Sequence, residues 1–415
     1  MKNKNTFLFP FILVTSLFFF WGFAHNLDPI LIPHLKKSFT LTTTQSTLVD
    51  SAVFIAYFIM ALPAGFIMKQ FGYKIGIIIG LILFAIGCFL FLPAANNQSY
   101  YFFLIALFII ACGLTILETA ANPYAAALGD AATSIQRLNL AQSFNGLAAA
   151  LAPIIGARII LTKGFSDIEL NKMTEAGRKI ALASEASSVK LPYAVLGIVL
   201  LVIAVLFALT HLPKIQGNHE VSNTKNIFHA FKHKHLSWAV AAQFFYVGAQ
   251  VSVFSLFILY ATKSASITQI KAADFLGICG IAFLIGRFFG TFLMQFIKPN
   301  LLLTAYAGIN ILLCIIAITG KGMLTVYTVI GICFFMSIMF PTIFSLGIKE
   351  LRGDIEYGSS LIIMSIVGGA ILPRFFGLIS DATGNVQLGY FVPFICFIVV
   401  LLFGWKGYKV SETKK

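Results

Sequence analysis

Residues 101–128 read YFFLIALFIIACGLTILETAANPYAAAL, an apolar run with a single charged side chain, Glu118. About 20 mostly apolar residues in a helix span a bilayer, so this run predicts a membrane helix. A carboxylate in the middle of such a helix is costly and therefore indicates function. Two other acids, Asp28 and Asp50, lie in comparably apolar runs. Three acids in membrane helices indicate a polar path that handles protons or other cations.

Similar apolar runs recur along the whole chain. Of its 415 residues, 59% are hydrophobic and 11% are charged, and the mean hydropathy is +0.92. Soluble domains are far less apolar, so we expect an all-α membrane protein with about 12 transmembrane helices. The N-terminal run is too long for a signal peptide and is expected to remain as the first helix. The predicted helices cover 7–35, 45–68, 75–94, 99–128, 136–162, 190–212, 237–262, 268–297, 300–319, 322–348, 357–381 and 387–405.

The net charge of +14 indicates membrane topology rather than nucleic-acid binding. With both termini on the cytoplasmic side, the predicted cytoplasmic segments hold sixteen Lys and Arg and the outer segments hold ten. Cytoplasmic loops carry an excess of these residues, so the bias predicts both termini in the cytoplasm. The six cysteines lie in apolar runs without CxxC spacing and are expected to be neither disulfides nor metal ligands.

The chain divides near its middle. Residues 213–236, PKIQGNHEVSNTKNIFHAFKHKHL, form a basic polar stretch that predicts a cytoplasmic linker. A six-helix bundle is expected over 1–212 and another, followed by a short tail, over 237–415. Four histidines lie in the linker, but no cysteine or carboxylate cluster accompanies them. A solvated linker is therefore favoured over a metal site or pH sensor.

The two predicted bundles resemble each other weakly. The fourth helix carries Pro123 and ends in Gly-Asp, and the tenth helix carries Pro341 and ends in the same dipeptide. The second helix exits through GFIMKQFGYK and the eighth through GRFFGTFLMQFIK, each a glycine followed by a basic turn. Such internal symmetry is typical of transporters whose substrate site lies between two repeats near the middle of the membrane.

Polar residues also recur at helical spacing in two of the predicted helices. Gln142 and Asn145, at i and i+3, share one face of the fifth helix. Gln243, Tyr246 and Gln250 form one stripe on the seventh. These side chains suit hydrogen bonding to sugar hydroxyls, and they suit contacts between helices equally well.

At these residues the chain resembles the fucose permease-like branch of the major facilitator superfamily. The segments that carry the resemblance are WGFAHNLDPILIPHL, LETAANP, RLNLAQSFN, AQFFYVGAQ, PTIFSLGIK and YGSS. Members of this branch are bacterial sugar–proton symporters of the inner membrane. The resemblance implies two pseudo-symmetric six-helix bundles around a central cavity, and transport by alternating access.

The resemblance also implies roles for individual residues. Glu118 matches the central carboxylate that takes up the coupled proton, and Asp28 is expected to be a second proton-coupling residue. The expected substrate-binding residues are Asn26, Asn122, Gln142, Asn145, Gln243, Tyr246 and Gln250. The implied substrate is a hexose or 6-deoxyhexose, such as L-fucose, glucose, galactose or N-acetylglucosamine. We expect H⁺ as the coupling ion, no cofactor or metal, no nucleic-acid partner, and a monomer in the lipid bilayer.

Some residues depart from the pattern of this branch. Pro29 stands where the branch has its first-helix acid, so Asp28 is displaced by about 100° around an ideal helix. Asp50 stands where the branch often has an uncharged residue. More apolar residues in the C-terminal half, including Phe254 and Phe340, leave hexoses other than fucose open.

Two other classes of function stay open on the residues alone. One is an exporter of drugs or metabolites on the same fold, although such antiporters usually carry an acid in the turn where this chain has Lys69. The other is a polytopic membrane transferase, which needs a constellation of acids or of His and Asp. His25 and Asp28 are the only such pair, so we expect a transporter and not an enzyme.

Overall fold

The computed structural model describes residues 8–27, 31, 35, 38–39, 48–160, 172–213 and 227–410. All regular elements in this part of the chain are helices, which confirms the predicted all-α class. Eleven helical spans in it are long and apolar enough to cross a membrane, and α7 is a further helix of 27 residues. These helices agree with the prediction of about twelve.

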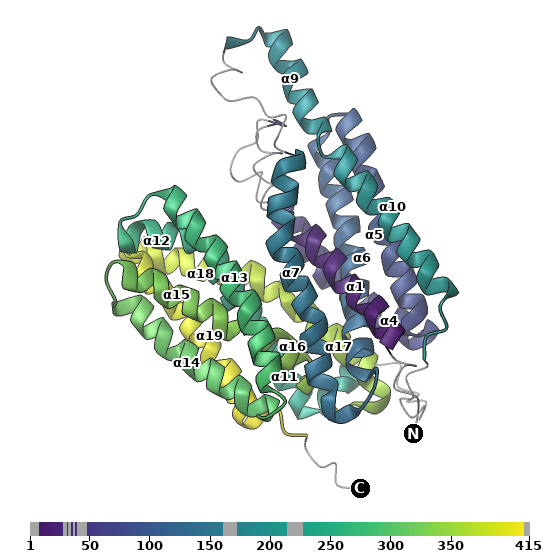
Figure 1. Cartoon of the computed structure of the whole chain (residues 1–415), viewed down its shortest axis with the longest axis vertical. Helices are drawn as coiled ribbons and strands as arrows, with labels where there is room; N and C mark the ends of the chain where they lie inside the picture. Colours follow the sequence, from purple (N-terminus) through teal and green to yellow (C-terminus); the bar gives the residue numbers. More distant parts are fainter. Residues whose placement is uncertain are drawn as a thin grey trace.

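The helices of the first half lie together in one group (Figure 1). They are α1 (Leu8–His25), α4 (Leu48–Phe71), α5 (Tyr73–Asn96), α6 (Tyr100–Ala127), α7 (Ser134–Ile160), α9 (Glu175–Ser187) and α10 (Lys190–Leu209). Helix α6 contacts α4 and α5, α10 contacts α5, and α1 contacts α7. Helix α6 therefore lies inside this group, and its residues from Ile110 to Ala126 are all buried.

The helices of the second half are shorter on average, because some membrane spans consist of two helices. They are α11 (Lys234–Ser255), α12 (Phe257–Ala265), α13 (Gln269–Leu293), α14 (Pro299–Thr319), α15 (Met323–Met336), α16 (Met339–Gly347), α17 (Ile355–Met364), α18 (Gly368–Thr383) and α19 (Phe391–Leu402). The break between α15 and α16 has a clear cause. Pro341 has no N–H group and cannot bond the carbonyl four residues earlier, which belongs to Ser337. The helix turns at Ser337 and Ile338.

Several pairs of helices join the halves. Helix α4 packs against α17, and α7 packs against α13 and α16. At one end of the molecule, α4 and α13 finish and α7 and α17 begin, and the halves are in contact there. We term this the closed end. Figure 1 shows the two groups of helices diverging from there towards α9 and α12. We term that opposite end the α9 end.

The structure corrects three boundaries of the predicted segments. The first helix ends at His25 rather than extending to residue 35. Residues Glu175–Ser187, expected in an outer loop, form α9, which is capped by Thr174 and leads almost directly into α10. Helix α11 begins at Lys234, inside the expected linker, and His235 is 1% exposed rather than solvated. Its ring lies 2.9 Å from the Lys349 carbonyl, which explains its burial.

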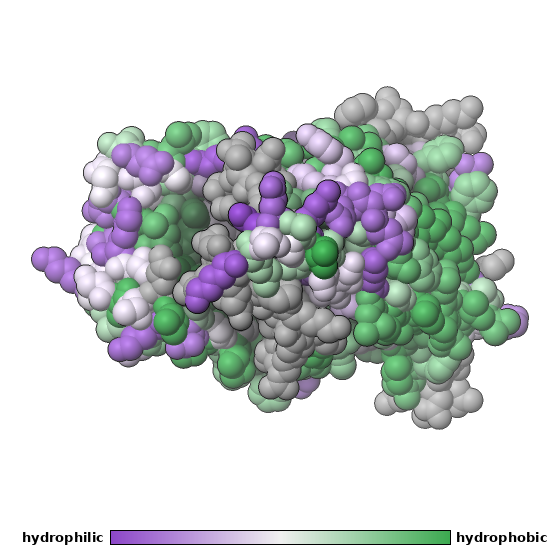
Figure 2. All heavy atoms as spheres, turned by 90° about the horizontal axis from the view of Figure 1, so that it is seen from above, coloured by the Kyte–Doolittle hydropathy of each residue, from purple (hydrophilic) through white to green (hydrophobic). Residues whose placement is uncertain are grey.

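Large apolar side chains cover the flanks of the molecule. Figure 2, viewed from the α9 end, shows hydrophobic residues along one flank and hydrophilic residues gathered on the end itself. On α4 the exposed apolar residues include Ile55, Phe58, Ile59 and Phe66. An exposed apolar flank of this kind faces lipid. The protein is a multi-pass membrane protein.

Candidate functional site

Glu118 lies in the middle of α6 and is 8% exposed. The close approach of α5 holds this part of α6 in place, since a Cβ atom at Gly80 would lie 2.9 Å from Leu117 Cγ. The Tyr57 hydroxyl on α4 donates a hydrogen bond of 2.6 Å to Glu118 Oε1. So short a bond is typical of an O–H donor on a carboxylate. The sequence analysis missed Tyr57, because nothing in α4 marks one tyrosine as a carboxyl partner.

Two of the predicted amides form hydrogen bonds that lead from Glu118 towards the second half. Asn122 Nδ2 donates to the Glu118 carbonyl at 2.8 Å, and Gln142 Nε2 donates to Asn122 Oδ1 at 3.0 Å. Both amides are buried. The structure therefore brings together Glu118, Asn122 and Gln142, three of the predicted site residues, on α6 and α7.

Arg287 extends this chain of bonds across the two halves. It lies on α13, is 4% exposed, and donates from Nη1 to the Gln142 carbonyl at 2.6 Å. Arg287 was not among the predicted site residues. The signal was available, since a buried arginine in a membrane helix indicates function for the same reason as Glu118.

Asn26 and Asn145 lie where α1 and α7 meet. A Cβ atom at Gly22 would lie 2.9 Å from Asn145 Cγ, so the asparagine packs directly on the α1 backbone. Asn26 Nδ2 donates to the Gly22 carbonyl at 2.6 Å. Both side chains are partly exposed, so both lie at the edge of the packed interior.

The predicted stripe on α11 is divided by burial. Gln243 and Tyr246 are 0% exposed, whereas Gln250 is half-buried. Among the described residues, neither polar atom of the Gln243 amide has a hydrogen-bond partner. The Tyr246 ring lies 6.5 Å from that of Phe340, and Tyr246 is within electrostatic range of Arg287. Among the described residues, no hydrogen bond joins Gln243 or the Tyr246 hydroxyl to Glu118.

Two predicted acids cannot be placed. Asp28 lies outside the described residues, and the structure describes the backbone of Asp50 but not its side chain. In the part of the chain that is described, no group of three or more His, Cys, Asp or Glu could hold a metal ion.

Polar and close contacts hold the two halves together at the closed end. Lys69 of α4 lies over the Tyr357 ring of α17 at 4.4 Å. Gly65 of α4 faces Ser360 so closely that a Cβ atom would overlap the hydroxyl. Between α7 and α13, Gln136 Nε2 donates to the Met294 carbonyl at 2.9 Å. The halves are therefore in contact on this side of Glu118.

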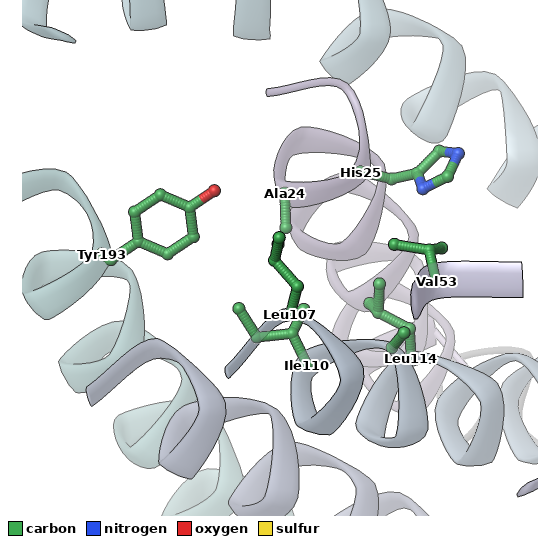
Figure 3. Close-up of a pocket in the computed structure, with 8 residues that line it drawn as sticks. Ala24, His25, Val53, Leu107, Ile110, Leu114 and Tyr193 are labelled. Atoms are coloured by element: carbon green, nitrogen blue, oxygen red, sulfur yellow. The ribbon is translucent and has the colours of Figure 1, made fainter. Parts of the chain in front are cut away.

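A pocket opens on the other side of Glu118, towards the α9 end. Figure 3 shows Leu107, Ile110 and Leu114 rising from α6, with Tyr193 on one side and His25 on the other. Leu114 lies one helical turn before Glu118 on the same helix. The lining is mostly apolar, so this pocket borders the polar residues without containing them.

Known proteins resemble this chain over nearly its full length. A sequence model of the Major Facilitator Superfamily matches residues 11–354. The L-fucose-proton symporter of Escherichia coli (strain K12) is 42% identical over 409 residues, covering 97% of this chain and 93% of the symporter. A glucose/galactose transporter of Brucella abortus biovar 1 (strain 9-941) is 38% identical over 410 residues, covering 98% of this chain and 96% of the transporter. A crystal structure of the transporter FucP in the outward conformation is 41% identical, with a TM-score of 0.91 over 98% of this chain and 100% of that chain.

Proposed function

The chain belongs to the Major Facilitator Superfamily, and on that premise we propose that it is a proton-coupled sugar importer that works by alternating access. The observation that carries the proposal is the buried Glu118 carboxyl group, which accepts a hydrogen bond from Tyr57. The backbone carbonyl of Glu118 accepts a bond from the Asn122 amide, which in turn accepts one from Gln142. Two relatives of nearly equal length are named as an L-fucose-proton symporter and a glucose/galactose transporter. Their names support a hexose or 6-deoxyhexose as the substrate.

In this proposal the coupled proton is carried by carboxyl groups. Glu118 takes up the proton, and Asp28, three residues after the end of α1 in the sequence, is a second proton-coupling residue. The protein changes between its two access states more easily when the carboxyl group is protonated, because moving an unpaired charge through a low-dielectric site is costly. The coupling ion is H⁺, and transport needs no cofactor.

The sugar is bound by amides and a phenol. Gln142 and Asn145 on α7 offer groups that bond sugar hydroxyls, with Asn122 and Asn26 beside them in the first half. Gln243, Tyr246 and Gln250 serve from α11. The Gln243 amide supports this role, because it is buried without a hydrogen-bond partner among the described residues. Such an arrangement is unfavourable unless a ligand bonds the amide in some state.

The closed end faces the cytoplasm, so the site opens to the outside at the α9 end. The excess of Lys and Arg in the predicted cytoplasmic segments supports this orientation, and so does the likeness to FucP in its outward conformation. The protein lies in a bacterial inner membrane as a monomer, with both termini in the cytoplasm.

The test is uptake of labelled sugars by cells that express the protein and lack other hexose carriers. The panel is L-fucose, D-glucose, D-galactose and N-acetylglucosamine, each with and without a protonophore. We expect accumulation of at least one sugar, and its loss when the proton gradient is collapsed.

Proteoliposomes with one imposed gradient at a time separate the alternatives. An inward H⁺ gradient should drive sugar uptake, and an inward Na⁺ gradient should not. Accumulation that survives the protonophore, or that follows Na⁺ alone, would contradict proton coupling. Expulsion of the solute against an inward H⁺ gradient would favour an exporter instead.

A further inference from the structure

Arg287 is a buried cation within a membrane-spanning helix. It lies within the span Ile270–Leu293 and is 4% exposed, with its guanidinium 4.6 Å from the centre of the Phe283 ring. No carboxylate in the described part of the chain forms an ion pair with it. Intramembrane arginines are costly and usually bond backbone carbonyls or other charges. The partners of Arg287 therefore show what its charge is used for.

Its first partner is a carbonyl that helix geometry leaves free. Arg287 Nε donates to the Ser337 carbonyl at 2.8 Å. Pro341 stands four residues after Ser337 and cannot donate to that carbonyl as an ordinary residue would. The break between α15 and α16 thus supplies an acceptor inside the membrane, and Arg287 occupies it.

Two glycines on α13 make this contact possible. A Cβ atom at Gly286 would overlap the Phe334 carbonyl and lie 2.9 Å from Ser337 Oγ, and one at Gly290 would lie 2.5 Å from Ile338 Cγ2. The backbone of α13 therefore rests directly on the break. This packing fixes the position of Arg287 relative to the second half.

Its second partner belongs to the first half. Arg287 Nη1 donates to the Gln142 carbonyl at 2.6 Å. The side chain of the same residue is bonded to Asn122, and Asn122 to the Glu118 backbone. One guanidinium therefore joins the break in the second half to the residue that ends the chain of bonds from Glu118.

We propose that Arg287 is a positioning residue for transport: its guanidinium clamps the Gln142 carbonyl of α7 to the Ser337 carbonyl at the α15–α16 break and so stabilises the state described here. In the opposite access state α7 and α13 separate at the closed end. Arg287 then keeps Ser337 and releases Gln142. This inference rests on the proposed alternating access, but it does not depend on which sugar is carried.

The test measures the separation of α7 and α13 without any substrate. Gln136 and Met294, which bond across these two helices, are both replaced by cysteine in a protein whose six native cysteines are removed. Cross-linking with a short bifunctional thiol reagent reports the closed contact. We expect Arg287→Met to lower the closed-to-separated ratio about tenfold, the effect of losing one hydrogen bond from a charged donor. Arg287→Lys, which keeps the charge but not the two-pronged geometry, should lower it less.

Arg374→Met is the matched control, because Arg374 also lies in a membrane helix, α18, but is exposed. It should leave the cross-linking unchanged. An unchanged ratio in Arg287→Met with lower thermal stability would show that Arg287 only supports packing. An unchanged ratio with weaker sugar binding would show that it contacts the sugar, and either result overturns the proposal. Failure of the wild-type protein to carry sugar would refute the proposed function and leave the cross-linking result intact.

Discussion

Replacing Glu118 by glutamine tests the coupling site most directly. Glutamine keeps the shape of the side chain, and its carbonyl oxygen can still accept the hydrogen bond that Tyr57 donates at 2.6 Å. Changing a charged acceptor for a neutral one weakens such a bond by about 1 kcal/mol. That loss is small, so the variant should fold and still alternate. It cannot release a proton, so it should not use the proton gradient.

The size of the effect follows from the driving force. A membrane potential of 100 mV is worth about 2.3 kcal/mol per charge moved. One coupled proton therefore supports about 50-fold accumulation of a neutral sugar, since 1.36 kcal/mol corresponds to a factor of ten. In Glu118→Gln we expect this ratio to fall to about 1, while exchange of labelled sugar between equilibrated sides persists.

The assay uses membrane vesicles with an imposed potential of about 100 mV, and accumulation and equilibrium exchange are measured in the same preparation. Glu175→Gln serves as control, because Glu175 is an exposed acid on α9; it should behave as wild type. Accumulation by Glu118→Gln at the wild-type ratio would refute the reasoning and move the coupling to another acid. Loss of exchange together with accumulation would show that the carboxyl group is needed for the conformational change itself.

Three further predictions concern other residues of the candidate site. Tyr57→Phe removes the hydrogen bond to Glu118 Oε1, so we expect the pH dependence of uptake to move by up to about one unit; an identical profile would contradict a role for Tyr57. Gln142→Ala and Asn145→Ala should each weaken sugar binding by about 0.5–1.5 kcal/mol while proton-driven uptake survives at high sugar concentration, and unchanged affinities would assign both amides to helix packing. Gln243→Met removes an amide that is buried without a hydrogen-bond partner among the described residues, so it should stabilise the protein by about 1–3 kcal/mol and also weaken sugar binding. Calorimetry and sugar binding are measured on one preparation, and a gain in stability with no loss of affinity would contradict a role for Gln243 in binding.

Transfer of each segment from water to lipid is a local property, so it can be read from the chain directly. Runs such as 101–128 predicted the membrane helices, and the structure has them as spans. The cost of a buried charge is local too, and it identified Glu118 without any knowledge of its surroundings. The same cost applies to the buried Arg287, but Arg287 was not predicted to have a function.

Helix breaks and polar helices were harder to predict. Pro341 indicated a lost hydrogen bond, but the close packing of α13 on the turn at Ser337, through Gly286 and Gly290, could be seen only in the structure. Helix α9 is polar on average, so its hydropathy did not distinguish it from an outer loop. The stability of such a helix comes from what it packs against rather than from its own residues.

The sequence by itself determined that this protein is all-helical and spans a membrane, with a carboxyl group inside one of its helices, because hydropathy and the cost of burying charge act on each segment alone. The tertiary structure alone decided the partners of that centre. Tyr57 and Glu118 are 61 residues apart, and Arg287 and Gln142 are 145 residues apart. Which faces meet across such distances depends on the packing of whole helices, which no local pattern specifies.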